Sequence, residues 1–203
     1  MTLSVQEREC IGRAIRAAEE RTSGEIVCVL AETSSSVSML PVLLATFVAL
    51  VLPWLLVAFT AMPVYRILTL QILSFLVSLA ILCWQPVRVA LMPRRARRAV
   101  AHRVAMEQFR ERGLARKKDR TGILIFVSLA ERYARIVADE GISQCVPQAR
   151  WQTAVDTLIA HARTDRVADG FVAAIEICGA ELAAHFPRTE GNRDELPDRI
   201  YVI

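Results

Sequence analysis

Two long stretches without charge interrupt the pattern of polar and apolar positions along the chain. Residues 37–61 carry no charged side chain, and they exceed the roughly 20 residues that a helix needs to cross the hydrocarbon core of a bilayer. Residues 67–84 are also uncharged, with Gln71 as their only strongly polar side chain. Two buried core helices are the alternative, but uncharged runs of this length are more typical of membrane spans. We therefore predict a two-helix transmembrane hairpin within residues 37–92.

The segment before this hairpin predicts one helix and one strand. Ser4 and Glu7 have the spacing of a capping box, and apolar residues then recur at helical intervals, which predicts a helix over residues 4–21. Residues 25–32, EIVCVLAE, are short and rich in β-branched side chains, which predicts a strand. A single strand needs a partner on the same side of the membrane. The hairpin is therefore predicted to interrupt one folded domain.

Three helices are predicted after the hairpin. The first is amphipathic and ends at Gly113, with Val100, Val104 and Phe109 near its apolar face. The other two lie further along the chain, and Pro187 ends the last of them. Their apolar positions are Trp151, Val155, Leu158 and Ile159 in one, and Phe171, Ile175, Cys178 and Leu182 in the other.

Two strands are predicted between the first and second of these helices. The run GILIFVSLA, residues 122–130, is almost continuously apolar and suits a central strand that is covered on both faces. Glu131 and Arg132 follow at the expected turn. In the next run, RYARIVAD, Tyr133 and Val137 fall on one side of a strand and Ile136 falls on the other. Together the two runs predict a hairpin of strands.

Helices on both sides of a small sheet indicate an α/β fold, which we expect to be an α/β/α sandwich with the membrane hairpin inserted into it. The predicted organisation is residues 1–36 as the first part of the domain, 37–92 as the hairpin, 93–190 as the remainder and 191–203 as a C-terminal tail. The 203-residue chain has 54% hydrophobic residues and a mean hydropathy of +0.35, which is high for a purely soluble domain.

Charge predicts the orientation of the hairpin. Between Arg88 and Arg120 there are twelve Lys or Arg and three acidic residues, whereas the connector between the two spans offers Arg66 alone. Basic loops are retained on the cytoplasmic side, so we predict a two-pass protein of the cell inner membrane with both termini cytoplasmic. Without interleaved aromatic residues, this run favours anionic lipid over nucleic acid as its partner. The arginines expected to contact the membrane surface are Arg88, Arg94, Arg95, Arg97, Arg98 and Arg103.

Several segments carry a resemblance to a known family. They are SGEIVCVLAE, RTGILIFVSLAERYARIVADEGI, VPQARWQTAVDTLI, ADGFVAAIEICGAELAAHFP and DELPDRI. Together they resemble the TPM domain family, and within it the bacterial membrane-inserted branch. The resemblance implies an α/β/α sandwich, a phosphatase activity and, for some members, binding of a divalent cation such as Ca²⁺ or Mg²⁺. Plant relatives are linked with photosystem assembly, so it also implies a membrane protein complex as a partner.

The chain lacks two short motifs that are found in family members with the phosphatase label. Members with the phosphatase label carry Asp-Asn-Gly before the first hairpin strand and Gly-Tyr-Gly after the second. The matching positions here are Arg120, Thr121 and Gly122, and Glu140, Gly141 and Ile142. A Ca²⁺ or Mg²⁺ site needs several converging oxygen ligands. The remaining local candidates are Asp119, Asp139 and Glu140, for which a solvated loop and a strand end are the alternative interpretation.

No catalytic residue can be assigned from the sequence. It has no glycine-rich phosphate loop, no G-x-S-x-G elbow and no thiolate phosphatase motif. We therefore predict a binding or assembly module at the cytoplasmic membrane face, with the lipid bilayer and a membrane protein complex as partners. The alternative is a divalent-metal-dependent phosphatase of the TPM type. A third reading is a lipid-binding regulator that uses residues 94–103.

Overall fold

The computed structural model describes residues 3–33, 40–60, 62–84, 93–114, 121–188 and 197–203. These residues form two compact units, which we treat separately. One combines Met1–Ser34 with Arg98–Ile203, and the other is Ser35–Arg97. The larger unit is the α/β domain, and the smaller one contains the two apolar helices.

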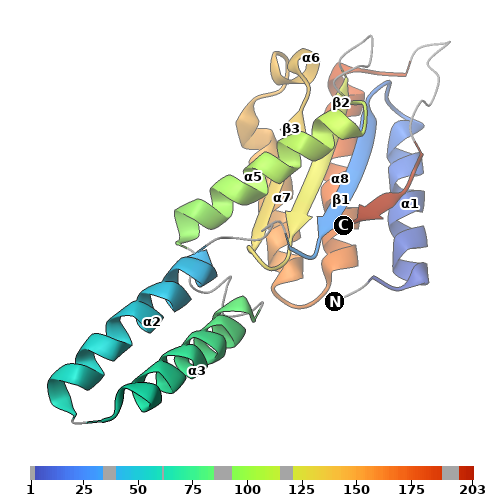
Figure 1. Ribbon diagram of the computed structural model, residues 1–203. Helices are drawn as coiled ribbons and strands as arrows, with labels where there is room; N and C mark the ends of the chain where they lie inside the picture. Colours follow the sequence, from blue (N-terminus) through green and yellow to red (C-terminus); the bar gives the residue numbers. More distant parts are fainter. Residues whose placement is uncertain (1–2, 34–39, 61, 85–92, 115–120, 189–196) are drawn as a thin grey trace. The chain divides into compact units, whose positions relative to one another are not determined.

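A four-stranded sheet organises the larger unit (Figure 1). Its strands are β1 (Glu25–Ala31), β2 (Gly122–Ser128), β3 (Tyr133–Ala138) and β4 (Ile200–Val202). In the order β3-β2-β1-β4, β1 pairs in parallel with β2 and β4, whereas β2 and β3 form an antiparallel hairpin. Every residue of β1 and β2 is buried, as expected for central strands covered on both faces. The mixed α/β fold predicted from the sequence is therefore confirmed.

The predicted helices of this unit are present, and the structure adds one short helix, α6, that was not predicted. The helices are α1 (Val5–Glu19), α5 (Arg94–Glu111), α6 (Glu140–Ser143), α7 (Gln148–Ala162) and α8 (Val167–His185). The predicted capping box at the start of α1 is confirmed, because the Ser4 side chain accepts a hydrogen bond from the backbone of Glu7 and the Glu7 carboxylate accepts one from Ser4. Gly113 follows α5 with a φ of +79°, a conformation that favours glycine.

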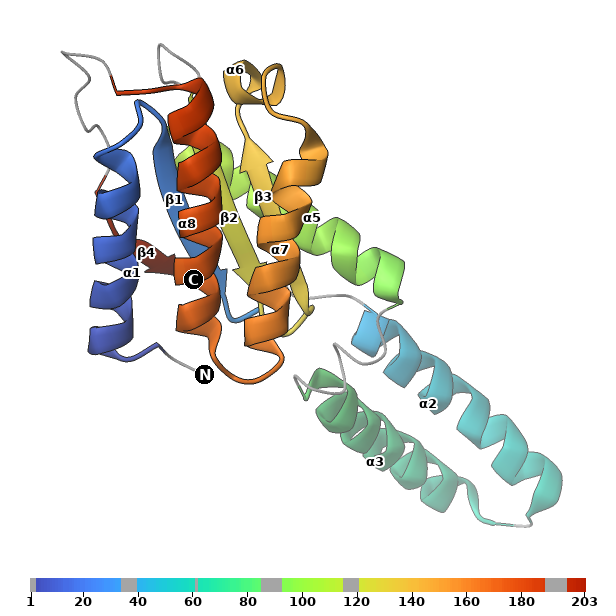
Figure 2. The ribbon, with the colours of Figure 1, turned by 180° about the vertical axis from the view of Figure 1, so that it is seen from behind.

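Alternating side chains of the strands divide the core into two layers. On one face, Ile26 and Cys28 of β1 pack with α1, α7 and α8, and on the other face Val27 and Val29 pack with α5. Figures 1 and 2, seen from opposite sides, show α7 and α8 behind the sheet in one view and in front of it in the other. The period-two pattern of the strands thus produces three layers, because successive side chains point to opposite faces.

The apolar face of α5 is formed partly by alanines. Ala101, Ala105 and Phe109 are buried against the sheet, and Val104 packs beside them. Val100, one turn before Val104, is half-buried and lies outside this cluster. Alanines let the helix approach the sheet closely, and short side chains of this kind carry little weight in a search for large apolar residues.

The end of the chain contributes an edge strand. β4 pairs with β1 in the register Cys28 to Ile200, and the Ile203 amide donates to the Leu30 carbonyl at 2.9 Å. Ile200 is buried in the core. The last residues of the segment that the sequence assigned to a tail therefore complete the sheet.

The smaller unit contains α2 (Leu40–Phe59) and α3 (Val64–Cys83), which pack against each other. Each has 20 residues and would be about 30 Å long at 1.5 Å per residue, close to the thickness of the hydrocarbon core. By length and composition alone, both helices could cross a membrane. Buried positions between them include Ala45 and Ala49, and small residues of this kind allow close helix packing in lipid.

Candidate functional site

The structure places two of the three predicted metal ligands at one edge of the sheet. Asp139 follows β3 and caps α6, because its Oδ1 accepts a hydrogen bond of 2.7 Å from the Glu140 amide. Its own amide donates to the Gly122 carbonyl at 2.9 Å, which fixes it beside the start of β2. The Glu140 side chain is exposed, and Asp119 lies outside the described residues. Among the residues that the structure describes, no three His, Cys, Asp or Glu side chains form a group that could hold a metal ion.

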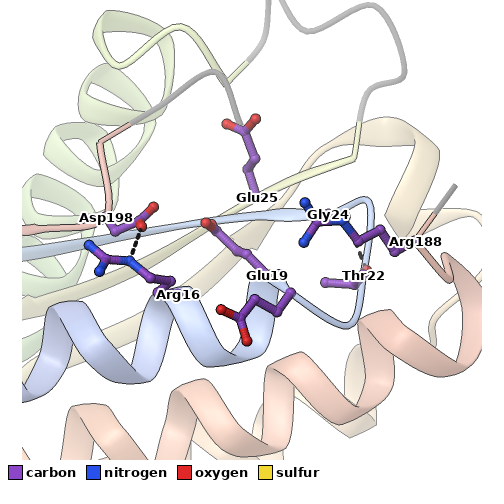
Figure 3. A pocket seen from close by; sticks show the side chains of 8 residues that line it. Arg16, Glu19, Thr22, Gly24, Glu25, Arg188 and Asp198 are labelled. Atoms are coloured by element: carbon purple, nitrogen blue, oxygen red, sulfur yellow. Dashed lines mark hydrogen bonds and ion pairs between the residues drawn. The ribbon is translucent and has the colours of Figure 1, made fainter. Parts of the chain in front are cut away.

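A polar cavity of about 260 Å³ opens near the same end of β1 (Figure 3). Its lining combines two arginines with four carboxylates, a formal charge of −2. The lining residues are Arg16, Glu19, Glu20, Thr22, Gly24, Glu25, Arg188 and Asp198. They come from α1, from the link between α1 and β1, from the first residue of β1, and from the segments after α8 and before β4.

Several polar groups of this cavity hold the chain in place. Oε1 of Glu19 accepts a hydrogen bond of 2.7 Å from the Ile26 amide and so joins the end of α1 to the start of β1. Thr22 donates to the Phe186 carbonyl at 2.6 Å and accepts from the Gly24 amide at 3.0 Å. These contacts tie the start of the sheet to the end of α8. Because Glu19 and Thr22 already make these hydrogen bonds within the protein, their bonded atoms are less available to bind a ligand.

The remaining carboxylates of the cavity point in different directions. Nε of Arg16 donates to Oδ2 of Asp198 at 3.0 Å, and this ion pair fastens the segment before β4 to α1. Glu25 is 3% exposed, and Figure 3 shows its side chain pointing away from the Arg16–Asp198 pair. The cavity therefore presents a polar surface of mixed charge without a convergent set of oxygen ligands among the residues described.

Sequence reasoning missed Glu25 and Asp198. Glu25 directly precedes an apolar strand, so a carboxylate at a strand start could have identified it as a sheet-edge residue. Asp198 reaches the cavity only because β4 pairs with β1, a contact between residues about 170 positions apart. No local pattern in the sequence predicts that pairing.

The predicted membrane-surface arginines lie mostly along α5. Arg94, Arg95, Arg98 and Arg103 are exposed, and Arg97 is half-buried. Arg88 lies outside the described residues.

One histidine on the same helix is affected by its surroundings. Burial lowers the pKa of His102, and the positive charge of Arg135 on β3 lowers it further. Both effects favour the neutral form of the His102 imidazole.

Comparison with known proteins identifies the domain. The family model described as the TPM domain matches residues 85–181, a segment that includes α5, β2, β3, α7 and most of α8. Residues 85–181 of this chain therefore contain a TPM domain. The family predicted from the sequence is thus confirmed.

A solved structure shows the same fold. The NMR structure of the BA42 protein from the psychrophilic bacterium Bizionia argentinensis is similar to this TPM-domain protein, with a TM-score of 0.64 and 22% sequence identity. The similarity covers 100% of this chain and 97% of that one. At this identity the likeness concerns the fold alone. A search of curated proteins returned no match.

Proposed function

We propose that this TPM-domain protein is a membrane-anchored binding module that docks a membrane protein complex at the cytoplasmic face. The observation that supports this most is the exposure of large apolar side chains on α2 and α3. Phe47 is 65% exposed, Trp54 80% and Phe59 82%. A surface of this kind is unfavourable in water, whereas it matches the hydrocarbon core of a bilayer.

The polar groups of the hairpin also suit lipid. Thr46, Thr60 and Thr69 each donate their hydroxyl to the backbone carbonyl four residues earlier. A hydroxyl satisfied within its own helix avoids the cost of an unpaired polar group in hydrocarbon. The hairpin can therefore enter a bilayer without carrying unsatisfied hydroxyls at these three positions.

The orientation rests on the basic helix. Exposed arginines of α5 lie on the C-terminal side of the second span, whereas on the connector side the first turn of α3 carries Arg66. The bias toward the cytoplasmic side places both ends of the chain there. In that arrangement the domain faces the cytoplasm, and α5 contacts anionic headgroups through Arg94, Arg95, Arg98 and Arg103.

The rival function is a divalent-metal-dependent phosphatase, as expected of a phosphatase-type family. We favour the binding module because Oδ1 of Asp139 is engaged in capping α6, and Oε1 of Glu19 is engaged at the start of β1. A shared fold does not determine an activity, so an experiment is needed to distinguish the two functions.

Calcium and magnesium titration of the full chain in nonionic detergent, followed by a phosphatase assay with p-nitrophenyl phosphate, separates the two functions. The test variant replaces Asp119, Asp139 and Glu140 by alanine. The matched control replaces three exposed carboxylates elsewhere, Glu9, Asp156 and Glu176, by alanine.

If the protein is a binding module, metal should not produce any phosphatase turnover that is lost in the test variant. Saturable metal binding and turnover that the test variant loses and the control variant keeps would establish the phosphatase and locate its site. Equal activity in all three proteins would assign the hydrolysis to a contaminant and leave the binding module standing.

A further inference from the structure

A second cavity, of about 440 Å³, lies between the turn that joins β2 to β3 and the C-terminal half of α7. Its lining includes the apolar side chains of Val127, Leu158 and Ile159. The charged residues that line it are Arg132 from the turn and Arg163 from the end of α7, and both are exposed. The described lining therefore combines an apolar floor with two cations and no carboxylate.

This combination fits an amphiphile with an anionic head. Guanidinium groups bind phosphate oxygens through paired, charge-assisted hydrogen bonds, and apolar side chains accept the start of an acyl chain. We propose that the cavity binds the phosphate of an anionic phospholipid headgroup between Arg132 and Arg163. This is a discrete site in the domain, separate from the general attraction of α5 to a charged surface.

The turns beside the cavity have an unusual backbone. Arg132 has a φ of 51° and Asp165, two residues after Arg163, has a φ of 64°. Aspartate tolerates this conformation, whereas arginine seldom adopts it, so the turn at Arg132 is strained. The Arg132 amide donates to the Leu129 carbonyl at 3.1 Å and holds the turn in this form. An arginine at this strained position is thus kept at the mouth of the cavity.

A hydrogen bond connects this turn to the segment that leads into the hairpin. The Thr33 hydroxyl donates to Oε1 of Glu131 at 3.2 Å. Residues 34–39 separate Thr33 from the start of α2, and a fully extended chain of that length spans at most about 25 Å. If α2 crosses the bilayer, as the proposed function requires, the domain that contains the cavity is covalently attached to a membrane span. The assignment to a lipid rather than to a soluble phosphate rests on that proposed function.

Two nearby features carry negative charge. The Glu131 carboxylate is beside Arg132 in the sequence and is 5% exposed, and the C-terminal end of α7 has a partial negative charge next to Arg163. Both features lower the positive potential around the two arginines. Replacing either arginine can therefore change stability by itself. For this reason the test compares the ligand concentration that gives a half-maximal response, and not the stability of each variant.

The test is a titration of the full chain in nonionic detergent, with the midpoint of thermal unfolding of the domain as the readout, because a ligand that binds the folded state raises it. The probes are dihexanoylphosphatidylglycerol, dihexanoylphosphatidylcholine and inorganic phosphate. The test variant is Arg132→Gln with Arg163→Gln. The matched control is Arg13→Gln with Arg21→Gln, which removes the same charge from two exposed arginines in and just after α1.

Phosphatidylglycerol is expected to raise the midpoint in the unmodified protein and in the control. In the test variant the half-maximal concentration should rise about tenfold or more, because charge-assisted hydrogen bonds are lost. Equal responses of all three proteins would show general charge attraction and overturn the proposal. An equal shift with inorganic phosphate would overturn the lipid assignment and leave a site for free phosphate.

A separate arm tests the anchor. The unmodified chain should float with neutral phosphatidylcholine vesicles in a density gradient. Failure to float would contradict the membrane anchor and with it the lipid source, while the detergent titration would still decide whether Arg132 and Arg163 bind phosphate.

Discussion

The α/β domain and the α2–α3 hairpin use the same apolar residue types in opposite surroundings. In the domain, Trp151 is 1% exposed and Phe171 is 0% exposed, whereas in the hairpin Trp54 is 80% and Phe47 is 65% exposed. The domain hides its large side chains between helices and sheet. The hairpin buries the small side chains of Ala45, at 0% exposed, and Ala49, and of its large side chains it buries Ile67. Water favours the first arrangement, and an apolar solvent would favour the second.

The difference also appears in the polar faces of the helices. α1 carries charged residues on the side away from the core, and α2 carries none anywhere along its length. A helix that is apolar all round needs either a core or a bilayer around it. Because its large side chains are exposed within its own unit, α2 requires the bilayer or a partner to cover them.

The largest expected effect contrasts two phenylalanines. Phe171→Ala removes a fully buried ring from the domain core and should lower the free energy of unfolding by about 3–5 kcal/mol. Phe47→Ala removes an exposed ring from the hairpin and should change the stability of the domain by less than about 1 kcal/mol. Urea unfolding of the full chain in nonionic detergent measures both. Equal losses would show that the hairpin packs as a second protein core.

A glycine on α1 provides the next largest effect. A Cβ added at Gly12 would lie 2.8 Å from the backbone oxygen of Asp198, so Gly12→Ala should push the segment before β4 outward at a cost of about 1–3 kcal/mol. The control is Gly113→Ala, where a Cβ meets nothing and the positive φ alone costs about 1 kcal/mol. Hydrogen exchange should show faster exchange of the Ile203 amide in Gly12→Ala alone. Unchanged exchange there would refute the close contact.

The capping box of α1 predicts a smaller loss. Ser4→Ala removes the side chain that accepts from the Glu7 amide and should cost about 1 kcal/mol of domain stability. Thr153→Ala, in the exposed middle of α7, is the matched loss of a hydroxyl without a cap. Urea unfolding should separate the two. Indistinguishable midpoints would show that α1 is held by packing alone.

The smallest expected effect is on the loss of domain stability at acidic pH. Because the pKa of His102 is lowered in the folded state, the unfolded chain binds its proton more readily. The contribution of His102 to stability is therefore complete above its unfolded value of about 6.5 and declines as the pH falls below it. Thermal unfolding at pH 7.5 and pH 5 should show a slightly smaller acid loss in His102→Gln than in the unmodified protein. The exposed His185→Gln is the control, and an identical change in both variants would rule out this effect.

Most local features of the fold could be predicted from the sequence. The alternation on β3 placed Tyr133 and Val137 on one side and Ile136 on the other. The core clusters confirm this and show that the first two lie on the α5 side. The helical spacing of Trp151, Val155 and Leu158 likewise predicted the buried face of α7. Such patterns are readable because they depend on neighbours in the sequence and on one periodicity.

Features that depend on distant contacts could not be predicted. The three residues of β4 are too few to show a period, and they become a strand only by pairing with β1. The cavity beside Arg16 exists because that pairing brings Asp198 to α1. The predicted ligands Asp139 and Glu140 are neighbours on a turn, and adjacency in the sequence did not make their side chains converge with a third carboxylate among the residues described.

Thiol labelling of the membrane-bound protein tests the central claim most directly. The design keeps Cys28 and Cys178, which are buried and whose pKa values burial raises, so both should stay unreactive. Cys83 and Cys145 become serine in every version. One version retains the exposed Cys10 of α1, and the other replaces it by serine and carries Met62→Cys in the connector between α2 and α3.

An impermeant maleimide is applied to intact bacterial cells that express each version and to inverted membrane vesicles. A hairpin that spans the membrane with both chain ends in the cytoplasm predicts that Met62→Cys is labelled in intact cells and Cys10 only in inverted vesicles. Labelling of both positions from the same side, or recovery of the chain in the soluble fraction after an alkaline wash, would contradict the membrane-spanning hairpin.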